Sequence, residues 1–318
     1  GVNEVPRRWA DLADPRLAGH VALADPSKSG SATKAFEMVL QQSMGEALAR
    51  RETPAKGSAE EALALAEGFD KGLRLIRRIA GNSRYFTDSA VKIPLDIAAG
   101  SAAVGMCIDF YGRFQSDMPG GSERLGFVLP EGGSSMGSDP IALLRGAPSP
   151  ALGRALIEFV LSPAGQALWA YRRGVPGGPE RYALRRLPIL PGLYAEELAP
   201  LRSDPGENPY RTAGAFTYHA SWTGPLFRAL AFVVRVMCVD TEEELHEAWR
   251  ELVSSGFPPR ARTLFDDMTH VSYAVVKGEV AKTLAGGSPL AEIELQNRLV
   301  TLLKAQYEEV ARLARSGQ

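Results

Sequence analysis

A chain of 318 residues with 45% hydrophobic and 23% charged side chains has a globular composition, with enough apolar mass for one large or two medium domains. Its 36 basic and 37 acidic residues leave a formal charge of −1, so the basic excess typical of nucleic-acid-binding proteins is missing and no nucleic-acid partner is expected. No apolar run approaches the roughly 20 residues that span a bilayer, and no signal-peptide pattern opens the chain. The first residues look like a connection into a domain, which predicts a processed or truncated start.

The first third of the chain alternates between strands and helices. Apolar residues 20–24 predict a buried strand, and after a small polar loop residues 32–42 place apolar side chains on one helical face. A second helix is predicted over 57–80, a short strand over 84–90, and the clearest buried strand over 102–110. Strand, polar loop and helix in this order are typical of an α/β fold.

The rest of the chain changes from mixed to helical. Residues 125–133 predict another short strand, and residues 149–173, which begin with a Ser-Pro pair, predict one amphipathic helix. A stretch rich in proline and glycine spans 174–215. From about residue 222 the pattern is nearly all helix and ends in a long terminal helix over about 290–315.

The loop before the first predicted helix is the most informative segment for function. Ser29, Gly30 and Ser31 lie where a strand turns into a helix, and the first N–H groups of a helix have no internal partners. Small residues let a ligand approach, hydroxyl groups add hydrogen bonds, and the helix dipole favours negative charge. The loop is predicted to bind an anion; the alternative is that Ser29 or Ser31 only caps the helix.

Two further segments carry candidate ligand contacts. Asp109 and Tyr111 follow the buried strand over 102–110, and ligands of open α/β sheets collect at the carboxyl ends of strands. Ser83 and Arg84 are candidate anion contacts in a third loop. The alternatives are a core aromatic for Tyr111 and a solvated surface charge for Arg84.

Catalytic and metal patterns of other kinds are missing from the sequence. Cys107 and Cys238 lie in apolar runs, which predicts small buried side chains, although a bridge between them cannot be read from sequence. The four histidines lack the spacing of zinc ligands. Since no paired acid and base and no order of Ser, His and Asp stands out, the sequence favours a binding protein without a cofactor over an enzyme.

Four stretches carry a resemblance to a known family. They are WADLADPRLAGHVALADPSKSGSATKAF (9–36), IAAGSAAVGMCIDFYG (97–112), the run from LGFVLP to SPAGQALW (125–169), and PGGPERYALRRLP (176–188). In this order they resemble the iron(III)-type family of ABC-importer solute-binding proteins, which has the type II periplasmic-binding-protein fold. The resemblance covers about residues 5–190 and implies two α/β lobes: the second lobe over 14–108, then the remainder of the first lobe and a helical C-terminal extension over 109–318.

The resemblance also implies a missing part. Family members normally begin with first-lobe strands and helices that have no counterpart in this chain. We therefore expect an exposed apolar face near Phe127, Val128, Leu156, Phe159 and Val160, covered in the natural protein by an N-terminal segment of the same precursor or of a separate chain.

The function implied by the resemblance is capture of a small solute between the lobes and its delivery to an ABC permease in the membrane. The protein would then be periplasmic or extracellular, with membrane association as a further option. Ferric-iron-binding members place adjacent tyrosines after the returning hinge strand; here Phe110 takes the first place, so Asp109 and Tyr111 remain as the metal ligands. A small anion is the other ligand considered. The alternatives are a non-transport sensor or scaffold and an α/β transferase or hydrolase.

Overall fold

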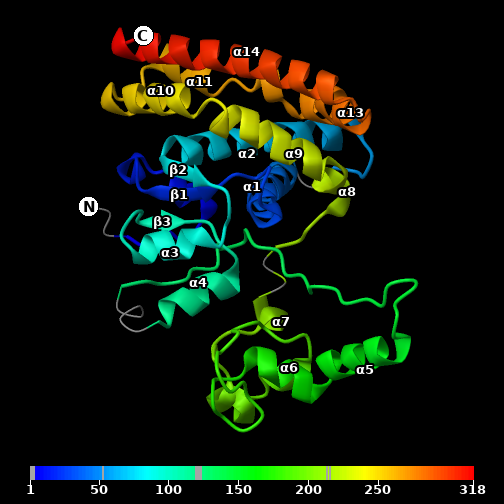
Figure 1. Ribbon diagram of the computed structural model, residues 1–318. Helices are drawn as coiled ribbons and strands as arrows, with labels where there is room; N and C mark the ends of the chain where they lie inside the picture. Colours follow the sequence, from blue (N-terminus) through cyan, green and yellow to red (C-terminus); the bar gives the residue numbers. More distant parts are fainter. Residues whose placement is uncertain (1–3, 52–53, 119–123, 213, 215) are drawn as a thin grey trace. The chain divides into compact units, whose positions relative to one another are not determined.

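The chain forms two compact units. The computed structural model describes residues 4–51, 54–118, 124–212, 214 and 216–318 (Figure 1). The first unit comprises residues 1–108, 128–134 and 218–318, and the second comprises 109–127 and 135–217. The two units are defined by contacts within the chain. The predicted division into lobes over 14–108 and 109–318 stays a prediction.

A small parallel sheet lies at the centre of the first unit. Its strands are β1 (Val21–Ala24), β2 (Ser83–Thr87) and β3 (Val104–Gly105), in the order β2-β1-β3. The register pairs Val21 with Ser83 on one side and with Val104 on the other, and Ala24 with Thr87. All four residues of β1 are buried, as the central strand of a parallel sheet requires.

Helices connect the three strands along the chain. Helix α1 (Gly30–Ala49) follows β1, and α2 (Ala59–Gly81) leads into β2, while the shorter α3 (Lys92–Ala98) precedes β3. The start of α2 has a strong local cause: Ser58 Oγ accepts a hydrogen bond from the Glu61 N–H at 3.0 Å. The predicted strand over 20–24 and the helices over 32–42 and 57–80 are confirmed, and the strand predicted over 84–90 forms as far as Thr87.

The C-terminal helices belong to the same unit and share its core. They are α8 (Ala220–Thr223), α9 (Phe227–Val234), α10 (Glu242–Ser254), α11 (Pro259–Phe265), α12 (Tyr273–Val275), α13 (Ala281–Ala285) and α14 (Pro289–Arg315). Trp249 of α10 and Tyr307 of α14 lie in one buried cluster with Phe36 of α1 and Phe69 of α2. Helices α10 and α14 lie next to each other on the side of α2 (Figure 1). The helical C-terminal third is therefore confirmed.

The second unit is built differently, from short helices and long connections. Its helices are α4 (Asp109–Ser116), α5 (Pro150–Leu161), α6 (Pro163–Ala170) and α7 (Pro209–Thr212), with short 3-10 helices at Pro191–Tyr194 and Glu196–Leu201. Its buried apolar cluster is small and consists of Ala167, Ala170, Tyr171 and Leu193.

Three sequence predictions need correction. The strand expected over 102–110 has only the two residues of β3, and Asp109 opens helix α4. No strand forms in the described residues 124–134, where 125–133 were expected to pair. The single helix expected over 149–173 is broken at Ser162, which is extended (φ −73°, ψ 160°) and caps α6 in front of Pro163.

One helical stretch is more apolar than the sequence analysis allowed. Residues Ala220–Val239 are long and apolar enough to cross a membrane by length and composition. However, 56% of the scored window is buried inside the structure, and Leu230 and Val233 belong to the main core. The core helix of a soluble protein passes the same test, so this stretch is weak evidence for a membrane span.

The fold class is therefore confirmed only in its coarser form. The protein is mostly helical with one small parallel sheet, which is consistent with an α/β solute-binding fold. The two-lobed arrangement stays a prediction.

Candidate functional site

The loop between β1 and α1 is held firmly at the carboxyl edge of the sheet. The Asp25 N–H donates to the Thr87 carbonyl oxygen at 2.8 Å, which ties the end of β1 to the end of β2. The buried carboxylate of Asp25 accepts from the backbone N–H and the hydroxyl of Ser27, at 2.8 and 2.7 Å. Thr33 fastens the far side of the loop by donating to the Pro26 carbonyl oxygen at 2.8 Å.

The predicted residues Ser29, Gly30 and Ser31 form the junction with α1. Ser29 is the N-cap, and its hydroxyl oxygen accepts from the Ala32 N–H at 3.3 Å. Gly30 and Ser31 are exposed and occupy the first two helical positions, whose N–H groups have no acceptor within the helix. Since α1 is 20 residues long, its dipole adds partial positive charge to these groups.

A buried polar cluster fixes the second turn of α1. The carboxylate of Glu37 accepts hydrogen bonds from Thr223 Oγ1 at 2.6 Å and from the Tyr218 hydroxyl at 2.8 Å, and Lys34 Nζ lies 2.8 Å away. Glu37 is completely buried, so these three partners satisfy a charge that would otherwise be costly. The cluster could not be predicted from sequence patterns, because Thr223 and Tyr218 lie about 180 residues from Glu37 in the chain.

The structure does not bring Ser83 together with the Ser29 loop. Ser83 begins β2 and pairs with Val21, so it lies at the amino edge of the sheet, whereas the Ser29 loop follows the carboxyl edge. Its hydroxyl donates to the Ala80 carbonyl oxygen at 2.7 Å and lies 3.0 Å from His246 Nε2. Burial lowers the pKa of His246, which favours its neutral form.

Arg84 is exposed next to this position. At the carboxyl edge of the sheet, β2 ends with Thr87, and Asp88 and Ser89 follow it. Asp88 forms an ion pair with Lys92 at 2.7 Å. Knowledge of the parallel register would have pointed to Thr87 and Ser89, in place of Ser83, as the candidate contacts near the Ser29 loop.

Asp109 and Tyr111 open helix α4 in the second unit. Burial raises the pKa of Asp109, while the guanidinium groups of Arg113 and Arg186 act in the opposite direction. Arg113 Nε lies 3.9 Å from the Asp109 carboxylate. The ring of Tyr111 packs against Phe110, with 4.5 Å between the ring centroids.

The described part of the chain offers no rich metal site. Among those residues, no group of three or more His, Cys, Asp and Glu side chains converges in a way that could hold a metal ion. Asp109 and Tyr111 would supply two oxygen ligands of the kind that ferric iron prefers. The remaining ligands would have to come from elsewhere.

Comparison with known proteins places the chain in a family. Residues 1–188 match the family model described as bacterial extracellular solute-binding protein. An uncharacterized protein of Haemophilus influenzae is 28% identical over 174 residues, which are 55% of this chain and 42% of that protein. A putrescine/agmatine-binding protein of Pseudomonas aeruginosa is 27% identical over 132 residues, which are 40% of this chain and 36% of that protein.

This chain thus matches less than half the length of each of these relatives. No solved structure matches it with significance. The family match covers more than half of the chain and includes both β1 with the Ser29 loop and the start of α4. The chain therefore belongs to the bacterial extracellular solute-binding proteins.

Proposed function

We propose that this chain captures a small anionic solute at the Ser29–Ser31 loop and delivers it to an ABC permease. The observation that carries this proposal is the amino end of α1: two exposed helical positions, a capping serine and a 20-residue helix, at the carboxyl edge of a parallel sheet. Membership of the solute-binding family supports the transport role.

The charges near the loop favour an anion over a cation. Asp25 is buried and already accepts two hydrogen bonds from Ser27, and Asp88 is paired with Lys92. Lys28, 62% exposed and 3.9 Å from Asp25, leaves its ammonium group in reach of solvent. A diamine such as putrescine, after which the Pseudomonas relative is named, needs free carboxylates, and the loop offers few of them.

Ferric iron is the second candidate, and it would use Asp109 and Tyr111. The phenol and the carboxylate suit a hard cation. Against it, the guanidinium groups of Arg113 and Arg186 lie close enough to Asp109 to influence its pKa, and positive charge repels a trivalent cation. We therefore place the anion first.

Replacing Ser29 and Ser31 together by leucine should abolish anion binding and leave the fold largely intact. The two leucine side chains would cover the amino end of α1, and the Ser29 cap would be lost at a cost of about 1 kcal/mol. Calorimetric titration with phosphate, sulfate, small carboxylates and putrescine measures the effect.

The matched control for that experiment is Ser58→Leu, which removes the cap of α2 instead. It should lose comparable stability and keep full binding. Anion binding that is unchanged in the double variant would sink the proposal, and so would a wild-type protein that takes putrescine in preference to every anion.

The ferric alternative makes a separate prediction. If Asp109 and Tyr111 bind ferric iron, the iron-loaded protein should show a visible phenolate-to-iron charge-transfer band, and Tyr111→Phe should lose it. A colourless protein without stoichiometric iron by elemental analysis would exclude that role. A sensor or scaffold would share the binding step, so solute uptake by membrane vesicles with the cognate permease separates those roles from transport.

A further inference from the structure

Helix α4 is fastened to the second unit by charged groups and not by an apolar face. Among its described residues only Arg113 is buried, and the Arg113 side chain is 6% exposed. No apolar side chain of α4 belongs to a buried apolar cluster in the part of the chain that the structure describes. Helix α6, by contrast, contributes Ala167 and Ala170 to the apolar cluster of this unit. A short helix without a packed apolar face depends on its remaining contacts to stay folded and in place.

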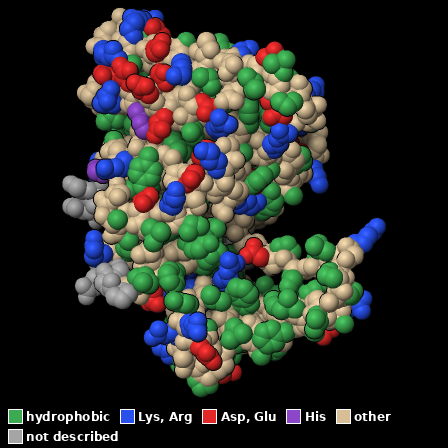
Figure 2. All heavy atoms as spheres, in the orientation of Figure 1, with side chains coloured by type: hydrophobic (Ala, Val, Ile, Leu, Met, Phe, Trp, Pro, Cys, Tyr) green, Lys and Arg blue, Asp and Glu red, His purple; other side chains and the backbone are tan. Residues whose placement is uncertain are grey.

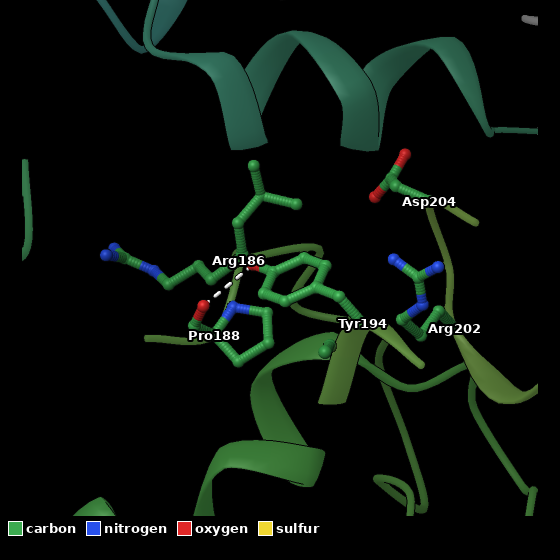
Figure 3. Close-up of a pocket in the computed structure, with 7 residues that line it drawn as sticks. Arg186, Pro188, Tyr194, Arg202 and Asp204 are labelled. Atoms are coloured by element: carbon green, nitrogen blue, oxygen red, sulfur yellow. Dashed lines mark hydrogen bonds between the residues drawn. The ribbon is translucent and has the colours of Figure 1, made fainter. Parts of the chain in front are cut away.

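Two acidic residues hold the Arg113 side chain. Its Nη1 lies 3.0 Å from the Glu207 carboxylate and 3.7 Å from the Asp204 carboxylate. The Asp204 carboxylate points toward α4, and Arg202 and Tyr194 lie on its other side (Figure 3). The Nε of Arg113 has no hydrogen-bond partner among the described residues. A buried guanidinium group that is only partly paired gains little net stability from its ion pairs.

Arg185 joins the same carboxylate from another segment of the chain. It donates to Asp204 from Nη2 at 2.5 Å and from Nε at 3.2 Å, and its Nη1 donates to the Arg113 carbonyl oxygen at 2.8 Å. The same nitrogen lies 3.2 Å from the carboxylate of Asp117, which follows α4. Arg185 has a φ of 55°, in the left-handed region that few residues other than glycine adopt. Its contacts with Asp204 and α4 therefore hold Arg185 in a strained backbone conformation.

Asp204 is thus the shared partner of two largely buried arginines. Its side chain is 10% exposed, and the side chains of Arg113 and Arg185 are 6% and 11% exposed. If Asp204 takes up a proton or is replaced by a neutral residue, the two guanidinium groups lose the negative charge that lies between them. Buried charges in this condition are costly, and movement of α4 away from the rest of the unit returns them to water.

We propose that Asp204, Arg113 and Arg185 form an electrostatic latch: α4 is docked while Asp204 is ionised, and it is released locally, with the rest of the second unit still folded, when Asp204 is neutral. Acid is the trigger that we expect, since carboxyl groups take up protons at about pH 4. Because α4 carries Asp109 and Tyr111, the latch decides whether these two candidate ligands are held in place or are free to move. The latch belongs wholly to the second unit and goes beyond the proposed function, which uses the Ser29–Ser31 loop.

The other titratable groups around the latch do not oppose this response to acid. The groups that surround Asp204 and Glu207 are Asp109 and Arg113 of α4, Asp117 after it, Arg185, Arg186, Tyr194 and Arg202. Arginine side chains stay charged in proteins, and burial raises the pKa of Tyr194, which keeps its phenol neutral. Acid therefore removes only negative charge from this cluster, and the repulsion among its arginines grows as the pH falls.

Hydrogen exchange of the full chain, followed separately for each helix, tests the latch. In wild type the protection factors of the α4 amides should fall at least about tenfold between pH 7 and about pH 4, while those of α6 stay unchanged. Asp204→Asn should show the same loss of α4 protection already at pH 7. The matched control is Asp139→Asn, which removes the exposed partner of Arg186 and should leave α4 as well protected as in wild type.

Protection of α4 that is equal at the two pH values, or unchanged in a folded Asp204→Asn protein, would overturn the proposal. A loss of protection in α6 together with α4 would overturn it as well, because the second unit would then open as a whole. If Asp204→Asn does not fold, the comparison of wild type at the two pH values still decides. The Ser29→Leu, Ser31→Leu protein should keep the latch, so failure of the solute site and failure of the latch can be told apart.

Discussion

Gly68→Ala should lower the free energy of unfolding by about 1–3 kcal/mol, because α1 and α2 pack too closely for a methyl group at this position. A Cβ atom on Gly68 would overlap the Cα atom of Met44 and lie 2.7 Å from the Ser43 carbonyl oxygen. These are backbone atoms of α1, so no flexible side chain can move aside. The intrinsic preference of a helix for alanine, about 1 kcal/mol, acts in the opposite direction and is outweighed.

Gly45→Ala is the matched control on the facing helix. A Cβ atom on Gly45 would meet nothing within 4 Å, so the same substitution should raise the free energy of unfolding by about 0.4–1 kcal/mol. Urea unfolding followed by circular dichroism measures both variants. Equal stabilities would show that α1 and α2 are not in the close contact described here.

Local signals predicted most of the first unit. The apolar run before Asp25 and the serine-rich loop after it were enough to predict β1, the Ser29 cap and α1. The helix-forming pattern over 57–80 did the same for α2. These features depend on residues close together in sequence, which is why pattern and propensity could identify them.

Features that depend on distant residues were missed or misplaced. The apolar run over 102–110 looks like a strand, but only Val104 and Gly105 find a partner in β1, and the rest of the run continues into α4. Ser83 was predicted, like Ser29, to be an anion contact in a loop, and only the parallel register shows that the two residues lie at opposite edges of the sheet. The Thr223 and Tyr218 partners of Glu37 likewise come from tertiary packing.

The second large expected effect concerns α5, whose apolar side chains are largely exposed to solvent. In the described chain no residue of α5 is buried: Leu152, Leu156 and Phe159 are 72%, 58% and 50% exposed. Exposed apolar side chains gather over this part of the second unit (Figure 2). The exposure expected at Leu156 and Phe159 is confirmed, whereas Phe127, Val128 and Val160 are only partly exposed.

The isolated chain should therefore bind a hydrophobic dye strongly and associate on size-exclusion chromatography. Replacing Leu152, Leu156 and Phe159 together by glutamine should remove most of both effects. Because these side chains bury little surface and glutamine is a good helix former, the free energy of unfolding should change by only about 0.5 kcal/mol.

A control for this experiment comes from α14, where Leu290 and Ile293 are 65% and 53% exposed. Their replacement by glutamine should leave dye binding almost unchanged, because a pair of exposed apolar side chains on a helix that is otherwise well packed is not a patch. If the wild-type chain is a compact monomer that binds no dye, the face of α5 is covered within the chain itself. In that case the triple variant should lose several kcal/mol of stability instead, as it would at a buried face.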